Sequence, residues 1–147
     1  MALQAQDLVT MSFTKGLDPQ YLELLAKYGH EVNFEPGTYI LKEGEPADQF
    51  YLIRQGRVAL GTFISGRGFT TIQTIGDDDV LGWSWLIPPH RWRFSALVIL
   101  PTQVICFDGQ RLREACEADH SFGYAIHQRV ALILGKRLEE TRKRLEL

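Results

Sequence analysis

Short segments of alternating apolar and polar residues, separated by turns that contain glycine, fill the middle of the chain. Turn-forming residues stand at Pro36-Gly37 and at residues 43–46, 55–57 and 65–68. Turn signals at intervals of about 8 to 12 residues are typical of antiparallel sandwiches, rolls and barrels, and not of βαβ units. The chain is therefore predicted to be mainly β, with an antiparallel, jelly-roll-like β-roll and flanking helices.

The hydrophobic periodicity places strands and helices around these turns. Strands are expected at residues 32–34, 38–41, 49–53, 58–64, 69–75, 92–99 and 102–107. An N-terminal helix is expected over residues 18–28, with Asp18 as its cap and Pro19 at its first position. A short helix capped by Asp108 and a long helix from Ser121 onward complete the prediction. The domain prediction is a β-roll over residues 13–120, followed by a C-terminal helix over residues 121–147.

The size and charge of the chain limit its class. It has 147 residues, of which 45% are hydrophobic, and this is enough for one substantial core. The formal net charge of -2 gives no general attraction to nucleic acid or to an anionic membrane. The N-terminus lacks the pattern of a secretory signal, and no apolar run approaches the roughly 20 residues of a membrane-spanning helix. The sequence predicts a cytoplasmic protein without membrane contact.

The long C-terminal helix carries two apolar stripes. Ile126, Val130 and Ile133 form one stripe, which is expected to pack on the roll. The second stripe follows a 4-3-4-3-4 spacing, and its members are His127, Ala131, Leu134, Leu138, Thr141 and Leu145. This seam either joins two copies of the chain in a homodimer, which we favour, or packs within one chain.

Residues 81–96 hold all three tryptophans of the chain. The indoles either fill a core, with their N–H groups bonded to nearby carbonyls, or form a cage or stacking platform for a planar or cationic ligand. The first interpretation is favoured, because bulky aromatic residues serve packing more often than recognition.

Three consecutive motifs resemble the opening strands of cyclic nucleotide-binding domains. They are Phe34-Glu35-Pro36-Gly37, Glu43-Gly44-Glu45-Pro46-Ala47-Asp48 and Phe50-Tyr51-Leu52-Ile53-Arg54-Gln55-Gly56-Arg57-Val58. The resemblance extends from Phe13 through the final helices. It implies a β-roll flanked by helices, similar to the sensor half of bacterial catabolite-activator-type regulators.

The resemblance also implies a phosphate-binding cassette of the pattern Gly-Glu, several residues, then Arg-Ser/Thr-Ala. Gly82 matches the glycine, but Trp83 stands in place of the glutamate and Trp92 in place of the arginine. One inserted residue would bring Arg93 to the arginine position instead. Strand alternation is expected to turn Arg91, Arg93 and Ser95 toward solvent. The candidate pocket residues are Gly82, Trp83, Ser84, Trp85, Trp92, Arg93, Phe94, Ser95 and Ala96.

These features predict a stand-alone regulatory or protein-interaction module, not an enzyme, that binds neither cyclic AMP nor cyclic GMP tightly. The alternative is a true small-ligand sensor that uses Arg93 and the backbone amides of residues 82–85, with the tryptophans stacking on the ligand. A third possibility is a subunit scaffold that needs no pocket. A homodimer and a protein partner are expected, whereas direct DNA binding is not, since no helix-turn-helix follows before Leu147.

No pattern nominates a metal, a cofactor or a catalytic residue. Asp77, Asp78 and Asp79 are expected to form a turn, because adjacent side chains diverge and no further ligand pattern follows. The histidines lack the spacing of a helical zinc motif. Cys106 and Cys116 are expected to be buried small hydrophobes.

Overall fold

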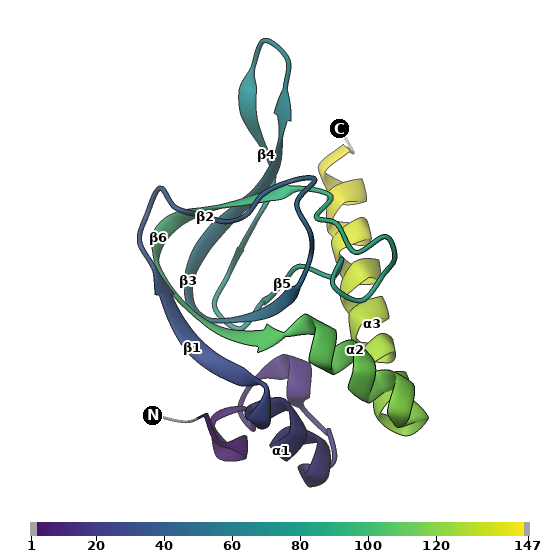
Figure 1. Cartoon of the computed structure of the whole chain (residues 1–147). Coiled ribbons are helices and arrows are strands. Elements are labelled where there is room, and N and C mark those ends of the chain that lie inside the picture. The colour runs from purple at the N-terminus through teal and green to yellow at the C-terminus, as the bar shows by residue number, and fades with distance from the viewer. Residues whose placement is uncertain (1–2, 146–147) are drawn as a thin grey trace.

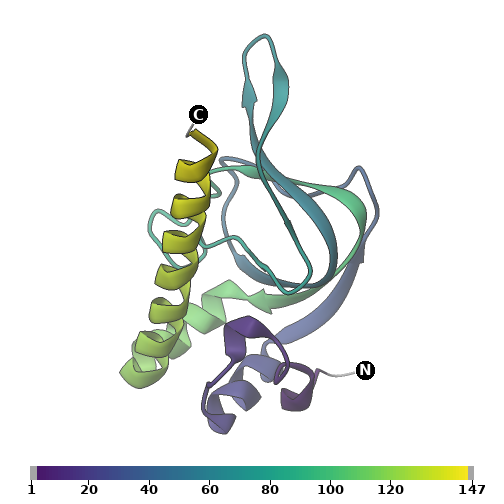
Figure 2. The ribbon, with the colours of Figure 1, turned by 180° about the vertical axis from the view of Figure 1, so that it is seen from behind.

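The computed structural model describes residues 3–145. Along the chain its elements are η1 (Ala5–Asp7), η2 (Ser12–Thr14), α1 (Pro19–Lys27), β1 (Gly29–Phe34), β2 (Tyr39–Leu41), β3 (Gln49–Ile64), β4 (Gly68–Gly76), β5 (Val80–Leu81), β6 (Ser95–Asp108), α2 (Gly109–Ala118) and α3 (His120–Leu145). The strands curl into a roll, and α3 stands along one side of it (Figures 1 and 2).

All the strand pairs of this sheet are antiparallel. The main path runs β1-β6-β3-β4, while β2 also pairs with β6 and β5 with β3. The prediction of an antiparallel β-roll with an N-terminal and a long C-terminal helix is confirmed. Among the helices of residues 3–145, none combines the length and apolar character needed to cross a membrane.

Two predicted strand breaks are wrong, because β3 and β6 each run without interruption. The turn-like residues 55–57 form an irregularity within β3, where the register against β6 shifts three times between Ile53 and Val58. Gly56 has a φ of 143°, and a Cβ there would lie 2.2 Å from the Thr102 hydroxyl, so the bulge needs glycine. Pro101 lies exposed in β6 opposite this bulge, where a missing backbone donor is tolerated.

The strand β6 begins at Ser95, three residues later than predicted. Trp92, Arg93 and Phe94 therefore lie in the connection from β5 and are not strand residues. The alternation argument that assigned faces to them does not apply.

The helix ends were partly anticipated. Asp108 caps α2 by accepting a hydrogen bond from the Arg111 amide, as predicted. Asp18 precedes α1 but makes no side-chain capping bond. At α3 the sequence analysis missed Asp119, whose carboxylate accepts from the amides of Ser121 and Phe122. Asp119 thus caps the long helix and is the single residue between the end of α2 and the start of α3.

The core joins the roll to the helices. Ile126 and Val130 of α3 are buried, and Ile133 packs against the core, as the first-stripe prediction requires. Leu8 and Met11 are also buried, although the predicted domain began at residue 13. The N-terminal turns therefore belong to the packed unit.

Candidate functional site

Residues 90–92 are fastened to the 44–47 loop by backbone hydrogen bonds. The amides of Gly44 and Ala47 donate to the carbonyls of Trp92 and His90, each at 2.8 Å, and the Trp92 amide donates to the Glu45 carbonyl at 2.9 Å. Three such bonds form a short strip of sheet-like pairing. They fix the backbone from which the Trp92 side chain projects.

Trp92 lies in the core, only 5% exposed. Its ring meets Gly82, which has a φ of 86°, and a Cβ at that glycine would lie 2.5 Å from the indole Cζ3. The Tyr51 ring lies 6.4 Å away, measured between ring centroids. The indole therefore occupies the space beside Gly82, and only glycine leaves enough room for it.

Trp83, Arg93 and Arg91 lie toward the exterior of the site. The Arg93 guanidinium stands 5.6 Å from the centroid of the half-buried Trp83 ring. The exposed Arg91 donates from Nη1 to the Gly44 carbonyl at 2.9 Å. Both arginines are exposed, as predicted, but they are exposed in a loop and not through strand alternation.

Trp85 and Ser84 lie in the turn formed by residues 83–86, which we call the 83–86 turn. Both side chains are fully buried, and the Trp85 ring packs 4.9 Å from that of Phe50. The Trp85 Nε1 donor and the Ser84 hydroxyl have no hydrogen-bond partner. The expectation that buried indoles bond to nearby carbonyls is therefore wrong for Trp85.

Two arginines that the sequence analysis missed hold this segment from the outside. Arg113 of α2 donates from Nη1 to the Trp85 carbonyl at 2.6 Å and to the Ala47 carbonyl at 3.4 Å. Arg137 of α3 donates to the Val80 carbonyl. Burial lowers the pKa of Arg137, and the neighbouring carboxylates of Asp79 and Glu140 oppose that shift. A signal did exist for Arg137, because it continues the spacing of the stripe that packs on the roll.

The second stripe of α3 is divided. Ala131, Leu138 and Leu145 are exposed, and so is His127, whose Nδ1 lies 2.7 Å from the Gly123 carbonyl. Leu134 packs partly against the core, and Thr141 donates to the Arg137 carbonyl. One edge of this stripe is therefore exposed, and on its other edge Leu134 packs against the core.

The sequence model of the cyclic nucleotide-binding domain matches residues 31–119. The chain belongs to the cyclic nucleotide-binding domain family. Domains of this family are mostly regulatory.

Known relatives agree with this membership. The chain is 27% identical over 131 residues to the CRP-like cAMP-activated global transcriptional regulator of Mycobacterium tuberculosis, and the match covers 89% of this chain and 57% of the relative. It thus spans little more than half the length of that regulator. A candidate cyclic nucleotide-binding protein from Geobacter metallireducens has a TM-score of 0.84 and 28% identity, covering 91% of this chain and 97% of that one. A cyclic nucleotide-binding domain from Methylobacillus flagellatus shares the fold at 20% identity, with a TM-score of 0.80, over 96% of this chain and 79% of its own.

The residues that the sequence analysis compared with the end of a phosphate-binding cassette lie at the start of β6. Ser95 is 1% exposed and its hydroxyl accepts from the Glu43 amide at 3.0 Å, so the prediction that it faces solvent is wrong. Ala96 is fully buried and pairs with Leu60. When this Ser-Ala pair is taken as the end of the Arg-Ser/Thr-Ala pattern, the residue before it is the half-buried Phe94.

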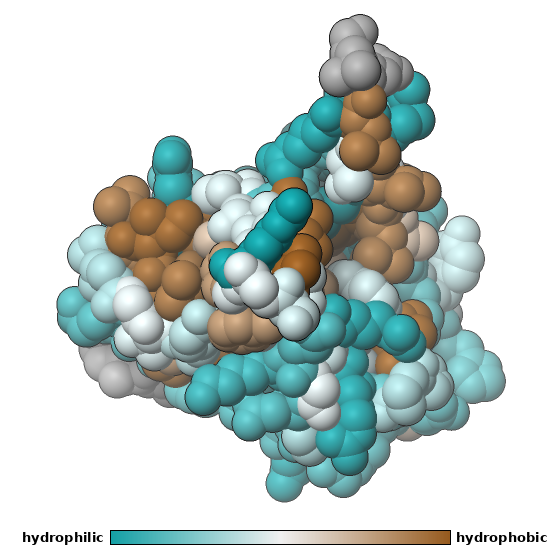
Figure 3. All heavy atoms as spheres, turned by 90° about the horizontal axis from the view of Figure 1, so that it is seen from above, coloured by the Kyte–Doolittle hydropathy of each residue, from teal (hydrophilic) through white to brown (hydrophobic). Residues whose placement is uncertain are grey.

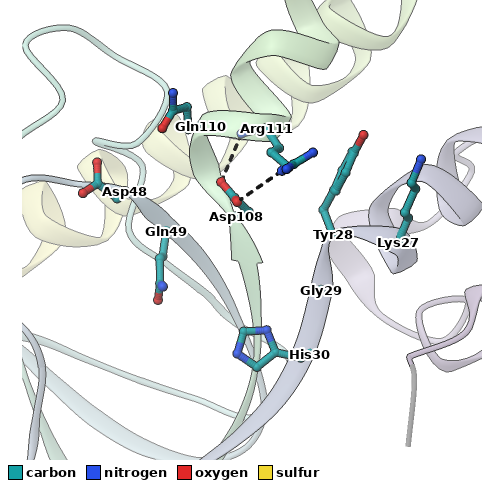
Figure 4. A pocket seen from close by; sticks show the side chains of 9 residues that line it. All are labelled: Lys27, Tyr28, Gly29, His30, Asp48, Gln49, Asp108, Gln110 and Arg111. Atoms are coloured by element: carbon teal, nitrogen blue, oxygen red, sulfur yellow. Dashed lines mark hydrogen bonds and ion pairs between the residues drawn. The ribbon is translucent and has the colours of Figure 1, made fainter.

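A separate open depression of about 680 Å³ lies where α1, β1 and the start of α2 meet. Figure 4 shows Tyr28 beside Lys27 and Arg111, and Arg111 bonded to Asp108. Every lining residue is exposed or half-buried, and none belongs to the tryptophan-rich segment. The depression is a surface feature distinct from the tryptophan-rich segment.

Other reactive groups are held in structural positions. Asp77, Asp78 and Asp79 accept hydrogen bonds from the backbone amides of Gly56, Ser12 and Gly76 respectively, in agreement with the predicted turn. Burial raises the pKa of both the Cys106 and Cys116 thiols to about 11, so at neutral pH they are protonated. In residues 3–145 no three His, Cys, Asp or Glu side chains gather as metal ligands would.

Proposed function

We propose that this chain is a regulatory or protein-interaction module of the cyclic nucleotide-binding domain family that binds neither cyclic AMP nor cyclic GMP tightly. The observation that carries the proposal is the Trp92 indole, which fills the space beside Gly82. We infer that a cyclic phosphate bound at this glycine would need the space that the ring takes. Here the protein supplies its own aromatic ring.

The charged groups that would anchor a cyclic nucleotide are also displaced. An indole has no acceptor, so Trp83 cannot accept a bond from a ribose hydroxyl. Arg91 and Arg93 lie exposed outside the site, and Phe94 precedes the Ser-Ala pair. One hydrogen bond to a charged group contributes about 1.5–3 kcal/mol, so losing two weakens binding by roughly 10² to 10⁴-fold.

The alternative function is a small-ligand sensor, which the name of the Mycobacterium tuberculosis relative, a cAMP-activated regulator, brings into consideration. The stacking of Arg93 over Trp83 favours it, because a planar anion could use both groups. The backbone amides of residues 82–85 would supply further donors.

A nucleotide titration separates the two functions. Tryptophan fluorescence and thermal unfolding are followed while cyclic AMP or cyclic GMP is added up to millimolar concentrations. Our proposal expects no saturable change at micromolar nucleotide. Micromolar binding that Arg93→Ala abolishes and Arg91→Ala retains establishes the sensor, and micromolar binding that both variants retain equally overturns our proposal.

We also propose that the chain forms a homodimer through α3. A protein partner would bind this dimer according to its conformation. Tyr124, Ala131, Leu138 and Leu145 repeat at intervals of seven residues, and all four are exposed. A seven-residue apolar repeat is the pattern of a coiled-coil seam. Hydrophobic atoms gather beside the C-terminal end of α3 (Figure 3).

Leu138→Asp is expected to convert the dimer to a monomer at micromolar concentration, because it places a charge in the seam while removing little intramolecular packing. Leu132→Asp is the matched control. Leu132 is 70% exposed and Leu138 72%, but six residues apart they lie about 120° from each other around the helix. Sedimentation velocity measures the mass of each. A wild-type monomer, or equal dissociation by both variants, contradicts the proposed seam.

A further inference from the structure

The hairpin formed by β3 and β4 projects beyond the rest of the molecule (Figures 1 and 2). Residues 63–69, which we call the hairpin tip, carry exposed apolar side chains: Phe63 is 59% exposed and Ile64 is 40% exposed. Figure 3 views the molecule from this end and shows hydrophobic atoms around the projecting hairpin. Apolar side chains that gather on a protein surface often mark a site of interaction with a partner or a membrane.

Three aromatic rings support one face of the hairpin tip. The rings of Tyr39, Phe63 and Phe69 contact one another, with centroids 5.6, 5.9 and 6.1 Å apart. Phe63 and Phe69 are directly opposite each other in the pairing of β3 with β4. The Lys42 Nζ lies 6.0 Å from the centroid of the Tyr39 ring. These contacts hold the aromatic side chains in place at the surface.

The other face of the tip is apolar as well. Ile64 follows Phe63 in β3, so its side chain points to the opposite face of the strand. Its partner in β4 is Gly68, which has no side chain to cover it. A groove on another protein would contact one face of such a hairpin. The apolar layer of a membrane would surround it, and this arrangement uses the side chains of both faces.

The hairpin lacks acidic residues. The chain contains 18 Asp and Glu residues, yet none lies between Asp48 and Asp77. The charged residue of the tip is Arg67, which is exposed. The tip is therefore cationic, although the formal net charge of the chain is -2. This local charge is complementary to an anionic surface.

The end of α3 adds positive charge beside the hairpin. Arg144 donates to the Ile72 carbonyl of β4, so the last turn of the helix lies against this hairpin. The two residues before Arg144 are also basic. Two carboxylates that contact the hairpin, those of Glu43 and Glu140, accept hydrogen bonds from its side chains. They contact it below the tip.

The backbone of the tip can leave water at little cost. Residues 61–64 pair with residues 68–71, and the Arg67 amide donates to the Ile64 carbonyl at 2.9 Å. Backbone groups that enter the apolar layer of a membrane need partners within the protein. The ladder of the hairpin meets this requirement up to the turn.

We propose that the hairpin tip inserts into the surface of an anionic membrane. Phe63 and Ile64 enter the apolar layer, and Arg67 binds the lipid headgroups. The strength of such a contact increases with the buried apolar area and with the attraction to anionic lipid. The sequence analysis expected no membrane contact, because it considered the charge of the whole chain and not that of one projecting hairpin. This inference goes beyond the proposed function and does not depend on it.

Flotation of the full chain with vesicles tests the inference. Vesicles of phosphatidylcholine and phosphatidylglycerol in equal amounts provide the anionic surface, and vesicles of phosphatidylcholine alone provide a neutral one. The chain is expected to bind the anionic vesicles about tenfold more tightly than the neutral ones, and to lose this preference as salt is added. Absence of binding to the anionic vesicles overturns the proposal.

Ile64→Ser and Ile99→Ser are a matched pair of variants. Ile99 of β6 is 43% exposed, close to the exposure of Ile64, but it lies outside the hairpin. Ile64→Ser is expected to weaken binding to the anionic vesicles about tenfold, because its side chain no longer enters the apolar layer. Ile99→Ser should leave binding unchanged. Equal losses in the two variants overturn the proposal, and Phe63→Ser serves if Ile64→Ser does not fold.

Arg67→Gln and Arg57→Gln test the charge in the same way. Both arginines are exposed, but Arg57 pairs with Gly76 at the end of the hairpin farthest from the tip. Arg67→Gln is expected to weaken binding about fivefold, whereas Arg57→Gln should have little effect. A larger loss in Arg57→Gln than in Arg67→Gln contradicts insertion of the tip.

A polarity-sensitive dye attached after Ser65→Cys distinguishes insertion from adsorption. Cys106 and Cys116 are buried, so the dye reacts at the tip. Its emission is expected to shift to shorter wavelengths when anionic vesicles are added. Vesicle binding without this shift overturns the proposal. A shift that follows protein concentration in the absence of vesicles also overturns it, because the tip then packs against a second copy of the chain. No nucleotide is present, so these outcomes do not bear on the proposed function.

Discussion

Gly82→Ala is expected to lower the free energy of unfolding by about 2–6 kcal/mol, measured by urea denaturation. A φ of 86° strains an alanine, and its methyl group would overlap the Trp92 ring at 2.5 Å. Strained backbone costs on the order of 1–3 kcal/mol, and overpacking a core adds about 1–3 kcal/mol. The Trp92 backbone cannot yield easily, because its amide and its carbonyl are both bonded to the 44–47 loop.

Gly66→Ala is the matched control for the backbone term alone. Gly66 has a φ of 83°, but nothing lies within 4 Å of the position a Cβ would take. Gly66→Ala should therefore lower the free energy of unfolding by less than Gly82→Ala does. The difference between the two variants is the cost of the overlap with the Trp92 ring. Adding Trp92→Leu to Gly82→Ala should then cost less than the sum of the two single changes. Equal losses at the two glycines, or simple additivity, contradict the contact between Gly82 and Trp92.

Trp85→Ala is expected to lower the free energy of unfolding by about 3–5 kcal/mol, because it removes a fully buried ring that packs on Phe50. Trp85→Phe should lose far less. It retains most of the ring and removes an Nε1 donor that has no partner, so part of the packing loss is offset.

The contrast between these two variants is the measurement of interest. If Trp85→Phe destabilises the protein as much as Trp85→Ala, the indole N–H contributes a bond, and the description of this buried position is incorrect. Cyclic nucleotide titration of both variants is a second measurement. Trp85 lies in the 83–86 turn, but its side chain points into the core.

The glycine spacing was enough to predict the roll, because turn residues report local backbone geometry. It could not distinguish a turn from a bulge at residues 55–57, since both use the same residue types. What decides between them is the partner strand, where Thr102 approaches Gly56 closely. Pairing between residues far apart in the sequence depends on the tertiary structure, and the hydrophobic periodicity of one segment does not predict it.

The candidate site, like the fold, could be predicted only in part from the sequence. The sequence located the tryptophan-rich segment, because that identification rests on residue type and order. It misplaced Ser95, because the face of β6 that carries this side chain is covered by the loop at Glu43, whose amide donates to the Ser95 hydroxyl. Arg113 and Arg137 were missed because charged residues on a helix ordinarily face solvent. For Arg137 the spacing of the buried stripe was a signal, whereas for Arg113 only the assembled structure brings the carbonyl within reach.

The strip of backbone pairing between residues 44–47 and 90–92 affects how fast the space beside Gly82 can open. Because three backbone bonds hold this strip, the Trp92 ring can leave Gly82 only by rotation of its side chain within the packed core, unless all three bonds break. Association would then be limited by the opening rate of the protein and would cease to rise with ligand concentration. A ligand that needed this space would therefore bind at a rate that the protein itself sets.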